Sequence, residues 1–191
     1  MIRSFLAIEL PAAILRNLEE VQKDLRSSDA DVRWVHLDKI HLTLKFFGNI
    51  EESQIDSIVK LIEDSVRSTR PFSLRVRGAG AFPNLRNPRV IWVGLVGGEE
   101  VLIPLQKQLE ASFQKIGFQP EDRPFQPHLT LGRMKSNRGK ENLVPRIEKH
   151  QDDELGNFQV EQLVLLKSDL RPSGPIYTAL REMKLGGNLT A

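Results

Sequence analysis

The chain of 191 residues contains no cysteine. This excludes disulfides, thiolate metal ligands and a cysteine nucleophile, and it fits a reducing cytoplasm, where we expect the protein to reside. No apolar run approaches the roughly 20 residues that a membrane-spanning helix needs. We also expect no signal peptide, because Glu9 and Pro11 interrupt the apolar stretch in "MIRSFLAIELP". The sequence therefore predicts a soluble protein with no membrane contact.

Net charge is also small. Lysine and arginine number 27 against 25 acidic residues, which gives a formal charge of +2. This balance does not indicate nucleic-acid binding. Basic residues cluster at 67–70, 75–77, 86–89 and 133–140, and for each cluster a solvated surface is favoured over a binding site. Because each neutralised phosphate needs a nearby cation, any nucleic-acid contact is expected to involve only one or two terminal nucleotides.

Several sequence signatures of cofactor and metal sites are missing. No Gly-Lys-Ser or Gly-Lys-Thr phosphate loop occurs, and the glycines at 78, 80, 97 and 98 are typical of turns. No His-x-x-x-His pair falls on a helix, and no tight cluster of histidine and carboxylate residues is present. We therefore expect neither a metal nor a cofactor.

The spacing of apolar residues indicates the elements of the fold. Helices are predicted over 11–27, 51–68 and 101–115, with a short helix over 138–150 that Pro145 breaks. Strands are predicted over 3–10, 31–36, 41–47 (ending at a Gly48-Asn49 turn), 72–82, 88–96, 127–134, 158–168 and 175–185. The order lacks the regular alternation of a doubly wound sheet, so we expect an α+β fold of antiparallel sheets with helices on their outer faces.

One tetrapeptide occurs twice. "HLTL" begins at His41 and again at His128, each time within a predicted strand. A repeat of a leucine-rich tetrapeptide can arise by chance. Side chains alternate along a strand, however, so the histidine and threonine of each copy share one face and the leucines share the other. The leucine faces belong on a core, and the polar faces can then meet across a groove.

A groove of this kind suits transfer at a phosphodiester. Of two imidazoles that titrate near neutral pH, one can act as a base while the other acts as an acid. The hydroxyls of Thr43 and Thr130 can bond phosphate oxygens, and Lys45 and Arg133 add nearby positive charge. Strict alternation sends Arg133 to the opposite face from His128, so it reaches the groove only if a bulge near Gly132 re-aims it; otherwise it is a surface or structural residue.

Three other residues carry weaker signals. His36 and His150 are predicted to have surface or structural roles. Phe82 lies at the mouth of the loop "FPNLRNP", where it can anchor the loop, join the core, or stack on a nucleic-acid base.

Five segments together resemble the 2H phosphoesterases, which are defined by two His-x-Thr motifs. The segments are "RSFLAIELP", "RWVHLDKIHLTLKFFGNI", "AFPNLRNPRVIWVGL", "FQPHLTLGR" and "LLKSDLRPSGPIYTAL". Within that superfamily they are most similar to the RNA 2′,3′-cyclic phosphodiesterase branch, also known as LigT-like 2′-5′ RNA ligases. The resemblance covers most of the chain, and no motif residue is substituted.

The resemblance implies one domain over residues 1–191, with two pseudo-symmetric lobes and a central cleft that carries both motifs. It implies metal-independent opening of an RNA-terminal 2′,3′-cyclic phosphate to a 2′-phosphate. The implied site residues are His41 as general acid, His128 as general base, Thr43, Thr130 and Arg133 as phosphate ligands, and Phe82 as a base-stacking residue.

The implied partners are RNA 3′ ends or small cyclic nucleotides, and we expect a monomer with no protein partner. Two alternatives stay open at this point. In the first, the same site catalyses the reverse reaction, and the protein is an ATP-independent 2′-5′ RNA ligase. In the second, the protein keeps the fold but binds RNA without catalysis.

Overall fold

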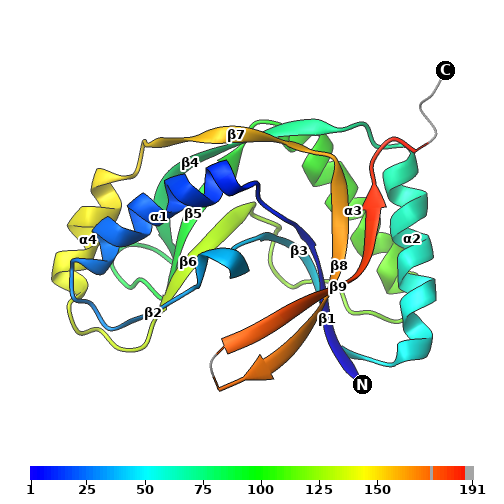
Figure 1. Cartoon of the computed structure of the whole chain (residues 1–191), viewed down its shortest axis with the longest axis horizontal. Coiled ribbons are helices and arrows are strands. Elements are labelled where there is room, and N and C mark those ends of the chain that lie inside the picture. The colour runs from blue at the N-terminus through cyan, green and yellow to red at the C-terminus, as the bar shows by residue number, and fades with distance from the viewer. Residues whose placement is uncertain (173, 188–191) are drawn as a thin grey trace.

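A computed structural model describes residues 1–172 and 174–187 and shows two antiparallel sheets (Figure 1). The first sheet has the order β3 (Leu42–Ile50), β1 (Ile2–Ile8), β8 (Gln162–Arg171) and β9 (Gly174–Lys184). The second sheet has the order β2 (Val32–Trp34), β6 (His128–Met134), β5 (Val90–Val96), β4 (Phe72–Phe82) and β7 (Glu154–Val160). The α+β class and the two antiparallel sheets are therefore confirmed, and one His-x-Thr motif lies in each sheet.

Four α-helices cover the sheets in two pairs. Helices α1 (Ala12–Arg26) and α4 (Lys140–Lys149) lie together over the second sheet, and α2 (Ile55–Arg67) and α3 (Glu99–Lys115) over the first (Figure 1). Two side-chain amides fasten helices to motif strands. Gln22 of α1 donates to the Leu131 carbonyl at 3.0 Å, and Gln106 of α3 donates to the Leu44 carbonyl at 3.4 Å. No helix among the described residues is long and apolar enough to cross a membrane.

The chain exchanges helices between its sheets. Helix α1 follows β1 of the first sheet but packs on the second, and α3 follows β5 of the second sheet but packs on the first. In both halves the next motif strand returns to lie beside the strand that preceded the helix, since β3 neighbours β1 and β6 neighbours β5. The two halves thus share one connectivity, which gives the lobes their pseudo-symmetry.

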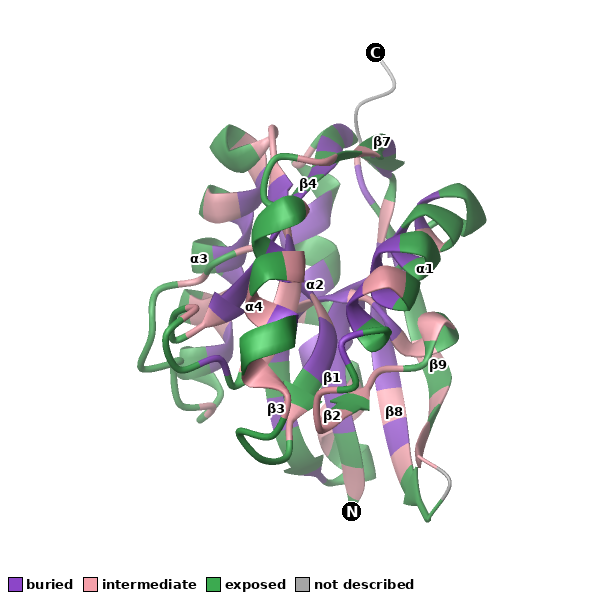
Figure 2. Ribbon diagram, turned by 90° about the vertical axis from the view of Figure 1, so that its left-hand side faces the viewer, coloured by how far each residue is buried: buried purple, intermediate pink, exposed green. Residues whose placement is uncertain are grey.

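The helices form because their apolar residues fall on one side. Ile58, Ile62 and Val66 of α2 are buried at helical spacing, and α1 buries a similar stripe against the second sheet. Figure 2 shows buried residues along the inner sides of the helices and the strands behind them, with exposed residues on the outer helix faces. Burial of these stripes fixes the sheets that carry the motifs.

Two details of the strand prediction were wrong. The single strand predicted over 158–168 is two strands, because the chain leaves the second sheet at Glu161 and enters the first. Only Glu161 separates the two strands, so the sequence shows no break between them, while Gly156 and Asn157 disguise the start of β7. Strand β3 also continues through the predicted turn at Gly48 to Ile50, with Gly48 paired opposite Ser4.

Pro145 does not break its helix. Helix α4 is continuous from Lys140 to Lys149, with Leu143 and Ile147 fully buried on either side of the proline. The proline removes the N–H that would bond the carbonyl of Glu141, which is an exposed residue near the helix start. Packing on both sides of the proline outweighs the loss of that one bond.

Candidate active site

A cavity of about 550 Å³ lies between the two sheets. Its walls come from both motif strands, from the segment after β4, and from the loop between α3 and β6. The cavity is lined by Lys45 and by all six site residues that the resemblance implies, namely His41, Thr43, Phe82, His128, Thr130 and Arg133.

The two histidines are held in the same way. Nδ1 of His41 is 2.9 Å from the carbonyl oxygen of Lys39, and Nδ1 of His128 is 2.7 Å from the carbonyl oxygen of Gln126. In each case the carbonyl belongs to the residue two positions earlier. A carbonyl only accepts hydrogen bonds, so Nδ1 carries the hydrogen, and the lone pair of each neutral ring is on Nε2. Nε2 is therefore the atom of each ring that is available for proton transfer.

Aromatic side chains pack against both rings. The His41 ring stacks on Phe5 at a centroid distance of 4.7 Å, and Tyr177 meets it edge-on at 5.4 Å. The His128 ring meets Phe82 edge-on at 5.0 Å. These contacts restrict how each imidazole can rotate, so that the geometry of the pair is fixed before any ligand binds.

The surroundings favour the neutral form of both rings. Burial lowers the pKa of His41 to about 4, although the hydrogen bond to Lys39 opposes the change. The pKa of His128 is also lowered, chiefly by burial and further by the positive charge of Arg133. Both rings are consequently neutral at pH 7 when the cavity is empty.

A β-bulge places Arg133 in the cavity. Trp92 pairs with Thr130 and Ile91 pairs with Gly132, so Leu131 is an extra residue in β6. Leu131 and Gly132 therefore both face the core, and Arg133 returns to the face that carries Thr130. Glycine is required beside the bulge, because a Cβ on Gly132 would lie 2.6 Å from the side chain of Val32. The bulge hypothesis made from the sequence is confirmed.

The first motif has a matching bulge with a different result. Leu44 is the extra residue there, because Ala7 pairs with Thr43 and Leu6 pairs with Lys45. Lys45 therefore points into the core, where it is only 4% exposed and its Nζ is 3.1 Å from the Glu110 carboxylate. Its Nζ also donates to the Gln119 carbonyl at 2.6 Å. Lys45 does border the cavity, as expected of a nearby cation, but its charge is paired with the Glu110 carboxylate.

The same bulge exposes Phe46, which sequence reasoning missed. Phe46 is the fifth residue after His41, as Arg133 is the fifth residue after His128, and it also lines the cavity. The residue is 54% exposed, which is unusual for a phenylalanine in a strand. The equal spacing of Phe46 and Arg133 from the two histidines could have identified Phe46 as a cavity residue. That inference requires both bulges to be known, and the sequence alone does not show them.

Tyr177 of β9 is a further cavity residue whose position the sequence did not reveal. Its ring touches His41 and Phe5, and Nζ of Lys39 lies 5.5 Å from the ring centroid. Burial raises the pKa of the phenol above its usual value. The hydroxyl therefore remains protonated at neutral pH and can serve as a hydrogen-bond donor.

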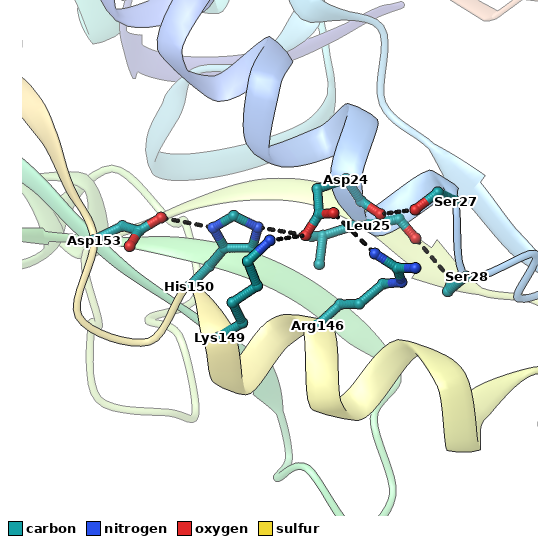
Figure 3. A network of polar contacts seen from close by, with 8 residues as sticks. All are labelled: Asp24, Leu25, Ser27, Ser28, Arg146, Lys149, His150 and Asp153. Atoms are coloured by element: carbon teal, nitrogen blue, oxygen red, sulfur yellow. Dashed lines mark hydrogen bonds and ion pairs between the residues drawn. The ribbon is translucent and has the colours of Figure 1, made fainter.

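The other two histidines lie outside the cavity, as predicted. The side chain of His36 is 88% exposed. His150 ends α4 and lies between two carboxylates, with Nε2 2.8 Å from Asp24 and Nδ1 2.6 Å from Asp153 (Figure 3). Figure 3 also shows Arg146 and Lys149 reaching the same Asp24, so this network fastens α4 to α1.

Comparison with known proteins agrees with this architecture. The profile of the 2′-5′ RNA ligase superfamily matches residues 10–172. This chain belongs to that superfamily. A relative from Methanothermobacter thermautotrophicus, named RNA 2′,3′-cyclic phosphodiesterase, is 40% identical over 96% of this chain and 99% of its own length. A relative of the same name from Aquifex aeolicus is 31% identical over 98% of this chain and 99% of its own length.

Two solved structures share the fold of this chain. TT0787 of Thermus thermophilus superposes with a TM-score of 0.82 at 30% identity, covering 97% of this chain and 99% of the other. Escherichia coli LigT in complex with 3′-AMP superposes with a TM-score of 0.78 at 28% identity, covering 96% of this chain and 98% of the other. The 2H phosphoesterase resemblance seen in the sequence is confirmed.

Proposed function

We propose that this protein hydrolyses the 2′,3′-cyclic phosphate at the 3′ end of RNA and leaves a 2′-phosphate. The observation that carries the proposal is the pair of identically anchored histidines in one cavity, each with Nε2 available. Full-length relatives in the same superfamily are named RNA 2′,3′-cyclic phosphodiesterases, which supports this substrate.

In the proposed reaction His128 acts as the base and His41 as the acid. Nε2 of His128 takes a proton from water as the water oxygen bonds to phosphorus. The bond between phosphorus and O3′ breaks, and Nε2 of His41 gives its proton to O3′. The product is a 2′-phosphomonoester with a free 3′-hydroxyl. Proton exchange with solvent then restores both rings.

Burial of His41 sets a condition on this mechanism. His41 is neutral in the empty cavity, so it can act as an acid only after it gains a proton. A bound phosphodiester carries a negative charge, and a neighbouring negative charge raises the pKa of an imidazole. Substrate binding thus favours the charged form of His41 that the reaction needs.

Three residues are proposed to hold the phosphate. The hydroxyls of Thr43 and Thr130 can donate to its non-bridging oxygens, one from each sheet. The guanidinium of Arg133 can donate two parallel bonds to the same group. Because these donors are fixed on strands before the reaction, they stabilise the charge that develops at phosphorus.

Two aromatic residues are proposed to receive the nucleoside. Phe82 lines the cavity from the second sheet, but the rings of Trp92 and His128 already pack against its ring. Phe46 on the first sheet presents more free surface. The complex of E. coli LigT with 3′-AMP supports a nucleotide site in this fold.

The test uses an oligoribonucleotide that ends in a 2′,3′-cyclic phosphate, in excess EDTA, with phosphorus NMR to identify the product. The wild-type protein should form a 2′-phosphate, and His41→Ala and His128→Ala should each lose about 10²–10⁴ in rate. His36→Ala is the matched control, because it removes an exposed histidine outside the cavity. Near-full activity in either cavity variant would show that the two-histidine mechanism is wrong. Loss of wild-type activity in EDTA would show that the reaction requires a metal.

A second experiment separates the two histidine roles. An aryl phosphodiester such as bis(4-nitrophenyl) phosphate has a leaving group that needs little protonation. The variant that lacks the general acid should therefore keep a larger share of activity on this ester than on RNA. We expect this of His41→Ala and not of His128→Ala, and the opposite result would exchange the two roles.

The superfamily's name favours a second candidate reaction. The reverse step joins a 2′,3′-cyclic end to a 5′-hydroxyl through a 2′-5′ bond, using the same two histidines and no ATP. The ratio of joining to hydrolysis on nicked RNA measures its share. No joining at high concentrations of RNA ends would refute it, and tight RNA binding with no turnover would favour a binding module.

We also propose that the chain acts as a single monomeric domain in the cytoplasm. One continuous hydrophobic core contains residues of both sheets and all four α-helices, which supports a single cooperative unit. Light scattering during size-exclusion chromatography tests the monomer, and a single unfolding transition tests the domain.

A further inference from the structure

Two arginines lie side by side at the edge of the second sheet. Arg33 of β2 pairs directly with Arg133 of β6 in the antiparallel register. Paired residues in antiparallel strands put their side chains on the same face, with Cβ atoms about 5 Å apart. Trp34 and Val32 pack on the opposite, helix-covered face beside Gly132. Arg33 therefore shares the face that carries Thr130 and Arg133.

This arrangement is unfavourable without a ligand. Like charges directly opposite each other destabilise a strand pair. Within residues 1–172 and 174–187, neither guanidinium has a carboxylate within ion-pair distance, unlike Arg77 and Arg146. Asp31 is two residues from Arg33, but its carboxylate is bonded by the Ser136 hydroxyl at 2.7 Å and lies 3.8 Å from Lys135. Both arginines are exposed, so an anion can reach them.

The two arginines differ in their distance from the reaction. Arg133 lines the central cavity, whereas Arg33 does not and lies one strand further out. A cyclic phosphate closes the 3′ end of an RNA, so the rest of the polymer continues from its terminal nucleotide only in the 5′ direction. A cation just outside the cavity is thus placed to meet the next phosphate on the 5′ side.

We propose that Arg33 binds the phosphate on the 5′ side of the terminal nucleotide while Arg133 binds the terminal phosphate. This inference rests on the proposed function, because it assumes that the cavity holds the RNA terminus. The contact between Arg33 and this phosphate should make the protein prefer oligonucleotides, or nucleotides with a 5′-phosphate, over cyclic mononucleotides with a free 5′-hydroxyl. Arg33 is a specificity residue here and does not touch the reacting atoms.

The test compares two product-like ligands by calorimetry, adenosine 2′-phosphate and adenosine 2′,5′-bisphosphate. The second ligand differs by one 5′-phosphate, so the ratio of the two affinities reports that group alone. In wild type we expect the 5′-phosphate to tighten binding about tenfold, as one charge-assisted contact does. In Arg33→Ala this gain should disappear while the affinity for adenosine 2′-phosphate is unchanged.

Two matched variants complete the design. Arg16→Ala removes an equal charge from an exposed position on α1 and should retain the gain. Arg123→Ala removes an arginine that also lines the cavity, from the loop between α3 and β6, and should retain it too. For an oligoribonucleotide ending in a 2′-phosphate, Arg33→Ala should reduce the slope of log affinity against log salt by about 0.7, the value for one contact to a single strand.

The outcomes separate the two proposals. If Arg33→Ala keeps the gain, or if Arg123→Ala is the variant that loses it, the inference about Arg33 is wrong and the proposed function stands. If Arg33→Ala weakens both ligands equally, Arg33 acts at the terminal phosphate and the inference is again wrong. If wild type binds neither ligand, the nucleotide site itself is refuted, and the inference with it.

Discussion

The buried state of His41 leads to a measurable dependence of stability on pH. Burial lowers the pKa of this ring from 6.5 to about 4. The unfolded chain therefore binds a proton at His41 near pH 6.5, whereas the folded protein binds it only near pH 4. Between these values the unfolded state holds more protons, so the free energy of unfolding falls as the pH falls. The effect is absent well above pH 6.5 and complete below about pH 4.

The size of the effect follows from the shift. Each pH unit of difference is worth about 1.4 kcal/mol, so the full shift corresponds to about 3 kcal/mol. Domains of this kind have total stabilities of about 5–15 kcal/mol, so the change is large enough to measure. Other groups titrate over the same range, and a comparison that cancels them is needed.

The assay is urea denaturation from pH 8 to pH 4 for wild type and for His41→Asn. The variant keeps every other titrating group, so the difference between the two free energies isolates His41. Relative to the variant, wild type should lose about 3 kcal/mol as the pH falls from 7 to 4. A saturating nucleoside 2′-phosphate should reduce this loss, because the bound anion raises the pKa of His41. Parallel curves for the two proteins would refute the neutral, buried His41 on which the proposed proton uptake depends.

Three further perturbations test other parts of the structure. Lys45→Ala leaves the Glu110 carboxylate, which is only 15% exposed, without its partner, and should cost about 3–5 kcal/mol in urea denaturation. Lys45→Met combined with Glu110→Leu should recover most of that loss. Asp24→Asn should lower the urea midpoint at pH 7, with a difference from wild type that shrinks below pH 3.8, because His150 and the two cations nearby lower the pKa of Asp24. Phe46→Ala should raise KM for a cyclic mononucleotide by about tenfold with little change in kcat, as loss of one stacked base predicts, and an unchanged KM would remove Phe46 from the nucleoside site.

Much of the candidate site could be predicted because its chemistry lies in local patterns. Alternation along a strand put His41 with Thr43, and His128 with Thr130, without any knowledge of the fold. The repeat then suggested that the two faces meet, and the cavity contains both. Helix positions were predictable for the same reason, since an apolar stripe at helical spacing is a property of one segment.

The parts that were missed depend on pairing between distant segments. A bulge exists only relative to a partner strand, so the inward turn of Lys45 and the outward turn of Phe46 are decided by β1. The exchange of α1 and α3 between sheets is hidden for a related reason. An amphipathic helix shows that it has an apolar face, but both sheets offer an apolar surface to cover.

The geometry of the site links substrate binding to its protonation. The empty cavity contains two neutral imidazoles and the positive charge of Arg133, which opposes protonation of His128. An anionic phosphate between the motifs offsets that charge and makes a proton on His41 favourable. In the proposed mechanism, the substrate therefore supplies the negative charge that converts His41 into an acid. On this proposal, the acid and base pair forms only when a phosphodiester is bound between the two motifs.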